Sequence, residues 1–407
     1  MHGLRGVVNR FIGMKRFNFP ATSAPDLSTA RAALAHTSAM RRLPLFSFAA
    51  ALCLAACSTP SPRPAPPPAA IPAAAEAQAL QVVPERYVSA DDASDELDSL
   101  ATWPADDGST WLIVTGKSSH QLVVFDAQTG ERLRSVGRKG HGPGEFLRPN
   151  GIAVYGDHVF VAERDNHRVQ VLSLPGFVPE GEFGAEQLRS PYGLWIHESA
   201  PDEYEVYVTD SFMDGEHYDV VPPLDQLDRR VRRYRVAFDD DGRMTARDEG
   251  SFGDTSEAKA LRIVESIAGD PAQQRLLVAD EDNRHASNLR EYTFDGKATG
   301  RELPAGSFEA QAEGVALWDC APEVGYWVAA DQRYPLTHFL LFDRDTLAPR
   351  GSFMGQTTAE TDGIALHAAA MPSFPSGALF AVHEDKAVAA FDLSDIVHAL
   401  GLDPRCE

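Results

Sequence analysis

The chain has few cysteines, few positive charges and no residue set with the spacing of a zinc site. Its 407 residues include four Cys, and the thirteen His are scattered, which argues against zinc. Lys and Arg number 37 against 59 Asp and Glu, giving a formal net charge of −22. Such an acidic chain repels phosphate backbones, so we expect no nucleic-acid partner and regard multivalent cations as natural ligands.

Long hydrophobic runs are also missing. The N-terminal apolar stretch, residues 43–56, is too short to span a bilayer core of about 30 Å. It follows the positive start Met40-Arg-Arg and ends in Leu54-Ala-Ala-Cys57, small residues before a cysteine. This segment resembles a bacterial lipoprotein signal, which implies a leader and signal peptide over 1–56 and a lipid on Cys57. By analogy, Ser58 after the lipid site favours outer-membrane sorting.

The rest of the chain divides into a linker and one domain. Residues 57–80 are rich in Pro and Ala and cannot form a packed core, so they are expected to be a lipid-anchored linker. Residues 81–407 are expected to be one folded domain, a monomer in the cell envelope, facing the periplasm or the cell surface. Its contact with the membrane would be the lipid alone.

Two cysteines remain once Cys53 leaves with the signal and Cys57 carries lipid. An oxidising compartment would allow Cys320 and Cys406 to pair and to staple the C-terminal tail to the fifth blade of the repeat described below. Two independent free thiols are the alternative.

The net charge changes when the predicted leader is removed. Without residues 1–56, which carry seven Lys/Arg and one Asp, the formal charge of −22 becomes about −28.

A short motif recurs six times, a polar residue and usually Gly leading into an apolar run, with a second apolar run about a dozen residues later. The starts are separated by 52, 42, 73, 48 and 49 residues, near the period of four-stranded propeller blades with one insertion. The runs are short and rich in β-branched and aromatic residues, which favours strands. The sequence therefore predicts an all-β, six-bladed β-propeller, whose last blade the segment 81–88 would complete. The six starting residues, here called the column, are Asp98, Asn150, Tyr192, Glu265, Glu313 and Asp362.

The column predicts a ring around one end of the propeller. The first strand of each blade lines the central channel, so equivalent residues gather at its mouth. Four of the six are carboxylates, whose mutual repulsion is relieved by hard cations such as calcium. A second column follows the second strand of each blade, with cations in the first two blades, and would hold an anion beside the calcium. Its members are Lys117, Arg164, Ser211, Glu281, Gln332 and Asp385.

Several motifs are similar to those of the β-propeller phytases. These are Glu313-Gly-Val-Ala-Leu317, Gly325-Tyr-Trp-Val-Ala-Ala-Asp-Gln332, Glu360-Thr-Asp-Gly-Ile364 and, in the first blade, Thr115-Gly-Lys117. The resemblance covers roughly residues 82–400 and implies a six-bladed, calcium-dependent enzyme of the 3-phytase type, which releases phosphate from inositol hexakisphosphate.

The resemblance assigns roles by matching position. Lys117 would be a phosphate-contacting cation and Tyr192 a hydroxyl on the calcium or substrate side. The residues expected to be catalytic are Glu265, Glu313 and Asp362. The residues expected to bind the phosphorylated small molecule are Lys117, Arg164, Tyr192 and Gln332. The residues expected to bind calcium are Asp98, Glu265, Glu281, Glu313 and Asp362.

The chain also departs from the phytase pattern. Ser99 and Gln311 stand where Asp is expected, Ser211-Phe212 replaces Lys-Glu, and Ala390 replaces Asn. The segment from Gly142 to Val171 resembles an NHL repeat instead. Two alternatives therefore stay open beside a phytase-like phosphomonoesterase. One is a non-catalytic NHL-like propeller that binds a ligand or protein in the envelope, and the other is a lactonase-like hydrolase that needs fewer calcium ligands.

Overall fold

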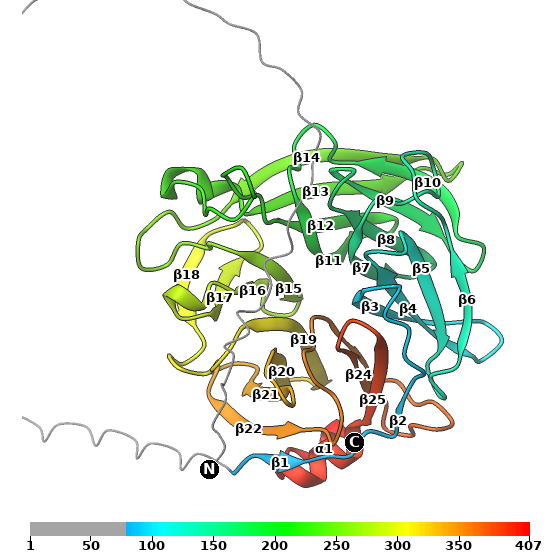
Figure 1. Ribbon diagram of the computed structural model, residues 1–407, viewed down its shortest axis with the longest axis vertical. Helices are drawn as coiled ribbons and strands as arrows, with labels where there is room; N and C mark the ends of the chain where they lie inside the picture. The colour runs from blue at the N-terminus through cyan, green and yellow to red at the C-terminus, as the bar shows by residue number, and fades with distance from the viewer. Residues whose placement is uncertain (1–78) are drawn as a thin grey trace, which may run out of the picture. The chain divides into compact units, whose positions relative to one another are not determined.

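The computed structural model describes residues 79–407, which form a six-bladed β-propeller (Figure 1). The predicted fold class is therefore confirmed. The predicted leader, the lipidation site Cys57 and the linker up to residue 78 lie outside the described residues. Within residues 79–407, no helix is both long enough and apolar enough to cross a membrane.

Blades one to four are antiparallel four-stranded sheets whose strands follow one another in chain order. The first blade contains β3 (Leu97–Pro104), β4 (Thr110–Gly116), β5 (Gln121–Asp126) and β6 (Arg132–Val136). The second contains β7 (Pro149–Tyr155), β8 (His158–Glu163), β9 (Arg168–Ser173) and β10 (Val178–Phe183). The third contains β11 (Pro191–Ala200), β12 (Glu203–Asp210), β13 (Val231–Phe238) and β14 (Met244–Phe252), with η1 (Leu224–Arg229) between β12 and β13. The fourth contains β15 (Val264–Asp270), β16 (Arg275–Asp280), β17 (Asn288–Thr293) and β18 (Ala298–Glu302), with η2 (Asn283–His285) before β17.

The N-terminal segment closes the ring through the last two blades. The fifth blade contains β19 (Ala312–Ala321), β20 (Val324–Asp331), β21 (His338–Asp343) and β22 (Pro349–Met354), and the sixth contains β23 (Ile364–His367), β24 (Ala378–His383) and β25 (Ala387–Asp392). The short β1 (Gln81–Val82) pairs in parallel with β22, and β2 (Tyr87–Val88) pairs antiparallel with β25. Thus β2 supplies the fourth strand of the sixth blade, as Figure 1 shows.

Hydrophobic clusters fill the interfaces between neighbouring blades. Phe160 of the second blade packs in one cluster with Val206 of the third, and Leu277 of the fourth blade shares a cluster with Trp327 of the fifth. The continuous apolar runs of the second strands, such as β8, β16 and β24, place apolar side chains on both faces of each sheet, because each blade is covered by two neighbours. The core therefore surrounds the propeller axis and leaves polar side chains for its ends.

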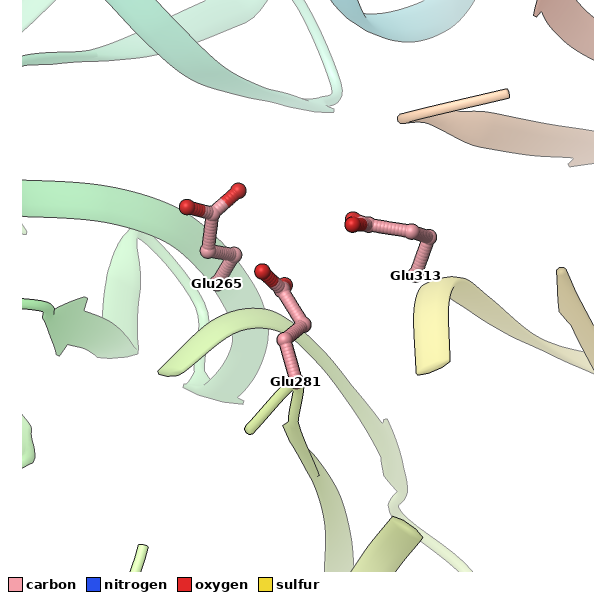
Figure 2. A group of neighbouring side chains, drawn as sticks. All are labelled: Glu265, Glu281 and Glu313. Atoms are coloured by element: carbon pink, nitrogen blue, oxygen red, sulfur yellow. The ribbon is translucent and has the colours of Figure 1, made fainter. Parts of the chain in front are cut away.

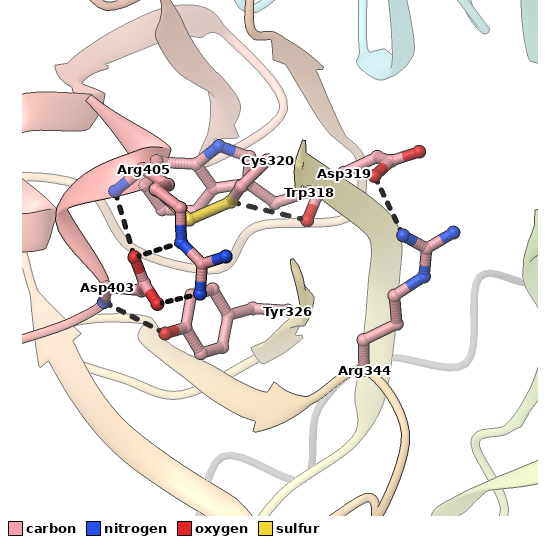
Figure 3. The surroundings of a disulfide bond; sticks show 8 residues. Trp318, Asp319, Cys320, Tyr326, Arg344, Asp403 and Arg405 are labelled. Atoms are coloured by element: carbon pink, nitrogen blue, oxygen red, sulfur yellow. Dashed lines mark hydrogen bonds and ion pairs between the residues drawn. A yellow bond between two sulfur atoms is a disulfide. The ribbon is translucent and has the colours of Figure 1, made fainter. Parts of the chain in front are cut away.

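A disulfide joins Cys320 of β19 to Cys406 in η3 (Pro404–Cys406), at a sequence separation of 86 (Figure 3). It follows α1 (Leu393–Leu400), whose buried Ile396 and Leu400 pack in the same cluster as the fifth- and sixth-blade strands. The Tyr326 hydroxyl accepts a 3.0 Å hydrogen bond from the backbone of Asp403 beside the disulfide. The C-terminal tail is thus fixed to the fifth blade.

Glu85, between β1 and β2, holds the closing segment against the loop after β22. Its carboxylate accepts backbone hydrogen bonds of 2.8 to 2.9 Å from Gln356, Thr357 and Thr358, and a 2.7 Å bond from the Thr358 hydroxyl. Burial opposes the charge, but the hydrogen bonds outweigh it and lower the pKa of Glu85. This carboxylate therefore connects the beginning of the domain to its last two blades.

Replacing Glu85 by Ala should lower the free energy of unfolding by about 1–3 kcal/mol, because charged hydrogen bonds are lost and their donors are left unpaired. Denaturant-induced unfolding measures the change. Glu131→Ala, at an exposed residue just before β6, is the matched control and should change stability little. Equal stability of the Glu85 variant and the parent protein would contradict a closing role for this carboxylate.

Candidate functional site

Most of the column residues lie at β-bulges, where the pairing register shifts near the beginning of the inner strand of each blade. The strand register shifts across residues 98–99, 150–151, 192–193, 265–266 and 313–314, and residue 362 lies just before β23. A β-bulge leaves its residue out of the ladder and redirects the side chain. The repeated bulge thus explains why one polar residue per blade departs from the apolar pattern of its strand.

The glycine after the column residue allows neighbouring blades to approach closely. A Cβ at Gly151 would lie 2.1 Å from the Tyr192 carbonyl oxygen, and one at Gly193 would lie 2.2 Å from the Glu265 carbonyl oxygen. No side chain fits at such distances. In the first blade, where Ser99 replaces glycine, the Thr115 hydroxyl donates a 2.5 Å bond to the carbonyl of the next column residue.

Backbone hydrogen bonds bring the second column to the same end of the propeller, here called the mouth. The Lys117 amide donates to the Glu96 carbonyl at 2.9 Å, and the Glu281 amide donates to the Ile263 carbonyl at 2.9 Å. The acceptor lies two residues before the column in both blades, and the bond recurs in the second, third and fifth blades. The two columns are therefore neighbours at the mouth, although most of their members lie about a dozen or more residues apart in sequence.

Lys117 is buried between two column carboxylates. Its Nζ lies 2.8 Å from Asp98 Oδ1 and 3.0 Å from Asp362 Oδ2. The Tyr192 hydroxyl donates to Asp98 Oδ1 at 3.1 Å, and the Gln332 side-chain amide donates to Asp362. Burial opposes the charge on Lys117, but the neighbouring aspartates hold its pKa well above the usual range. Four blades thus contribute to one ion-paired network.

Three further carboxylates, here called the glutamate cluster, converge beside this network. Figure 2 shows the side chains of Glu265, Glu281 and Glu313 directed toward a common space. One carboxylate oxygen from each lies within 4.8 Å of the others. Glu281 and Glu313 are 3% and 5% exposed, and Glu281 Oε1 has no hydrogen-bond partner among the described residues. The cluster therefore combines burial with one oxygen atom that residues 79–407 leave without a hydrogen-bond partner.

Burial and mutual repulsion raise the pKa of every member of the glutamate cluster. Burial is the first cause for all three, followed by the charges of neighbouring carboxylates. The pKa of Glu265 rises to about 8, and those of Glu281 and Glu313 lie well above their ordinary value. Burial likewise raises the pKa of Tyr192 well above its usual range, with Asp98 as the next cause.

The donor set of the glutamate cluster fits a hard divalent cation. Carboxylate oxygens are the ligands that calcium prefers, and a cation would neutralise the charges whose repulsion raises the pKa values. Zinc is a poorer match because no His or Cys takes part. Asp98 and Asp362, also predicted as calcium ligands, are instead engaged by Lys117. The mouth thus contains one ion-paired region and one region where carboxyl groups gather without an ion pair to a cationic side chain of residues 79–407.

Not every acidic residue at the mouth has this character. Asp280, directly before Glu281, accepts hydrogen bonds from the backbone amides of Arg262 and Ile263 at 3.1 and 3.0 Å. Asp331 accepts a comparable bond from the backbone of Ala310 at 2.9 Å. These aspartates hold the loops that lead into the inner strands. Their role is structural, which a count of acidic residues does not reveal.

Two further predicted residues, Arg164 and Asn150, have different surroundings. Arg164 Nε contacts Asp165 Oδ1 at 2.6 Å, so the guanidinium group forms an ion pair with the next residue in sequence. Asn150 is fully buried, and both polar atoms of its side-chain amide lack a hydrogen-bond partner within residues 79–407. Such a buried amide requires a polar partner, which bound water or a ligand would provide.

Sequence reasoning did not identify Arg148 as part of the mouth. Its Nη2 lies 3.1 Å from Glu96 Oε1, an ion pair between the first two blades. Burial opposes its charge, but Glu96 and Tyr192 raise its pKa, which places the guanidinium near the column. Arg148 lies two residues before the column residue Asn150. The residue type at the equivalent position of the other blades varies, so the repeat did not point to it.

Comparison with known proteins supports the fold and leaves the activity open. A family model described as a 6-bladed beta-propeller matches residues 108–217. No curated protein matches the chain. Similar solved structures include hydrazine synthase of Kuenenia stuttgartiensis, at 12% identity over 78% of this chain and 82% of that chain, with a TM-score of 0.44.

Two further solved structures are similar at the same level. A nidogen/laminin complex chain is 15% identical over 68% of this chain and 87% of its own, with a TM-score of 0.45. A catalytically inactive virginiamycin B lyase from Staphylococcus aureus with quinupristin is 10% identical over 75% and 98%, with a TM-score of 0.43. Identities and TM-scores this low carry no conclusion about function.

The raised pKa of Glu265 predicts that the metal-free protein loses stability as pH rises. The folded state binds this proton more tightly than the unfolded state, whose pKa is about 4.5, so the contribution is complete below that pH and is lost toward pH 8. Glu265→Gln should make the fall in Tm between about pH 5 and pH 8 shallower, as measured by thermal unfolding in chelator. Glu131→Gln should retain the parental slope. An unchanged slope in the Glu265 variant would contradict the assignment.

Proposed function

We propose that the mouth binds calcium through Glu265, Glu281 and Glu313 and that the protein hydrolyses phosphate monoesters of the inositol hexakisphosphate class. The observation that supports this most is the convergence of two buried carboxyl groups and one half-buried carboxyl group with an unsatisfied Glu281 oxygen. Keeping such groups together without a cation costs free energy, because each carboxyl group is deprived of water. A site with this composition is more readily explained by ligand binding than by stability.

The residues around the cluster have separate tasks in this proposal. Bound calcium would polarise phosphoryl oxygens and favour ionisation of water. Glu281 and Glu313, which share a hydrogen bond, would hold or accept a proton at their carboxylate oxygens. The Tyr192 hydroxyl, fixed by Asp98, would orient the ester.

A second candidate is a non-catalytic binding propeller, and Lys117 favours it. This lysine was expected to contact phosphate, yet its ammonium group is already flanked by Asp98 and Asp362. Its charge is therefore compensated before any anion arrives, which weakens attraction for phosphate. A ligand or protein partner of the envelope, bound with calcium but not hydrolysed, is compatible with the same cluster.

The proposed setting is the cell envelope, with a lipid on Cys57 as the attachment to the membrane. The N-terminal sequence supports this setting through its positive start, apolar stretch and small residues before cysteine. The Cys320–Cys406 bond is consistent with it, because disulfides persist in oxidising compartments.

The purified protein should release phosphate from inositol hexakisphosphate in calcium and not in chelator. Glu281→Gln should lower kcat/KM at least about tenfold, since an interaction worth about 1.4 kcal/mol in the transition state changes the rate by that factor. Glu131→Gln is the control and should retain full activity. Phosphate release is measured directly across pH 5 to 8.

Calcium-dependent thermal stabilisation separates the two candidate functions. A rise in Tm with calcium but no phosphate release at any pH would leave the binding propeller and exclude the phosphomonoesterase. If calcium changes neither Tm nor phosphate release, the proposed metal site itself is wrong.

A further inference from the structure

The connection between β12 and β13, residues 211–230, here called the insertion, is the longest between consecutive strands of the described propeller. It accounts for much of the 73-residue step in the repeat. It begins at Ser211, a member of the second column, so its base lies at the mouth. The insertion contains an antiparallel bridge between Asp214 and Val220, followed by η1. The proposed function gives this segment no role.

Arg230, the last residue of the insertion, joins the third blade to the fourth. Its guanidinium is fully buried and donates to four backbone carbonyl groups. Two belong to its own blade, Asp210 at 3.0 Å and Phe212 at 2.7 Å. Two belong to the loop before β15, Leu261 at 3.2 Å and Arg262 at 2.6 Å. One side chain therefore fixes both ends of the insertion to the loop of the next blade.

This buried cation is costly, and among the described residues no carboxylate forms an ion pair with it. The guanidinium carbon lies 4.5 Å from the centre of the Phe212 ring, and its acceptors are neutral carbonyl oxygens. Burial lowers the pKa of Arg230 to about 10, although the charge of Asp210 raises it. A buried charge of this kind contributes little net stability compared with an apolar side chain. A role in positioning the fourth-blade loop explains its presence better.

The loop held by Arg230 leads directly to two members of the glutamate cluster. The amides of Arg262 and Ile263 donate to Asp280 Oδ1, and the Ile263 carbonyl accepts from the Glu281 amide at 2.9 Å. Glu265 lies two residues after Ile263, at the bulge of β15. A displacement of this loop would therefore move the Glu265 and Glu281 carboxylates relative to that of the fifth blade.

We infer that Arg230 is a positioning residue for the mouth, which couples the third-blade insertion to the placement of Glu265 and Glu281. The insertion is thereby part of the framework of the site. The effect on cation affinity rests on the proposed calcium binding. The effect on the fourth-blade loop does not, because it follows from the hydrogen bonds of Arg230 alone.

Arg230→Lys tests the inference while retaining the positive charge. Lysine cannot reproduce four donors in a planar arrangement, so the loop should lose part of its support. Calcium affinity, measured by calorimetric titration of the full protein, should fall at least about fivefold. Arg344→Lys is the matched control, since Arg344 is also buried and bonds Asp270 at the other end of β15. The control should lose stability with calcium affinity unchanged.

Hydrogen exchange of the metal-free variants separates the inference from the calcium proposal. Arg230→Lys should speed exchange of the amides of residues 261–265 and 281 at least about tenfold, and Arg344→Lys should leave them at the parental rate. Faster exchange with no calcium binding by any form of the protein would overturn the proposed metal site and retain the positioning role. Unchanged exchange and unchanged calcium affinity in Arg230→Lys would overturn the inference.

Discussion

The close approach of neighbouring inner strands is the constraint on which the rest of the propeller depends. At Gly151 and Gly193 the backbone of the next blade lies where a side chain would begin. The bulge at each of these places turns one polar residue out of its strand while the apolar residues after it continue into the blade interfaces. Packing between blades and placement of polar groups at the mouth are therefore consequences of the same local backbone geometry.

That geometry produces two electrostatic regions of opposite character within one ring. Around Lys117, oppositely charged groups satisfy one another and form a network across the first and sixth blades. Around Glu281, carboxyl groups lie together, and the described part of the chain forms no ion pair with them. The first region connects two blades through ion pairs, whereas the second stores unfavourable electrostatic free energy that a ligand would relieve. A site that differs between its halves in this way is suited to recognising ligands with uneven charge.

The sequence was sufficient for the fold and for most of the mouth, because both repeat. A period near fifty residues identifies the blades, and a polar residue before Gly identifies the column. Contacts between residues of different blades do not repeat along the chain in this way, so the repeat does not predict them. The ion pair of Glu96 with Arg148 depends on two loops that become neighbours only when the blades pack. The adjacent Asp280 and Glu281 look equivalent in sequence, yet backbone amides satisfy the first alone.

The sequence also predicted the closing strands only in part. A short β-rich segment before the first blade indicated closure of the last blade, but its division into β1 and β2 on two different blades did not follow from the pattern. The pairing of Cys320 with Cys406 was one of two open alternatives, because spacing along the chain does not determine distance in space.

The division of the closing segment between two blades has a mechanical meaning. If the chain is tethered at Cys57, any tension on the tether enters the domain at β1, the first strand described. This strand contacts the fifth blade, Glu85 follows it, and β2 contacts the sixth, so a load would meet three attachments in succession. The disulfide fixes the other end of the chain to the fifth blade as well. Both ends of the domain are thus attached to the fifth and sixth blades. Of the glutamate cluster, Glu313 belongs to the fifth blade, whereas Glu265 and Glu281 belong to the fourth.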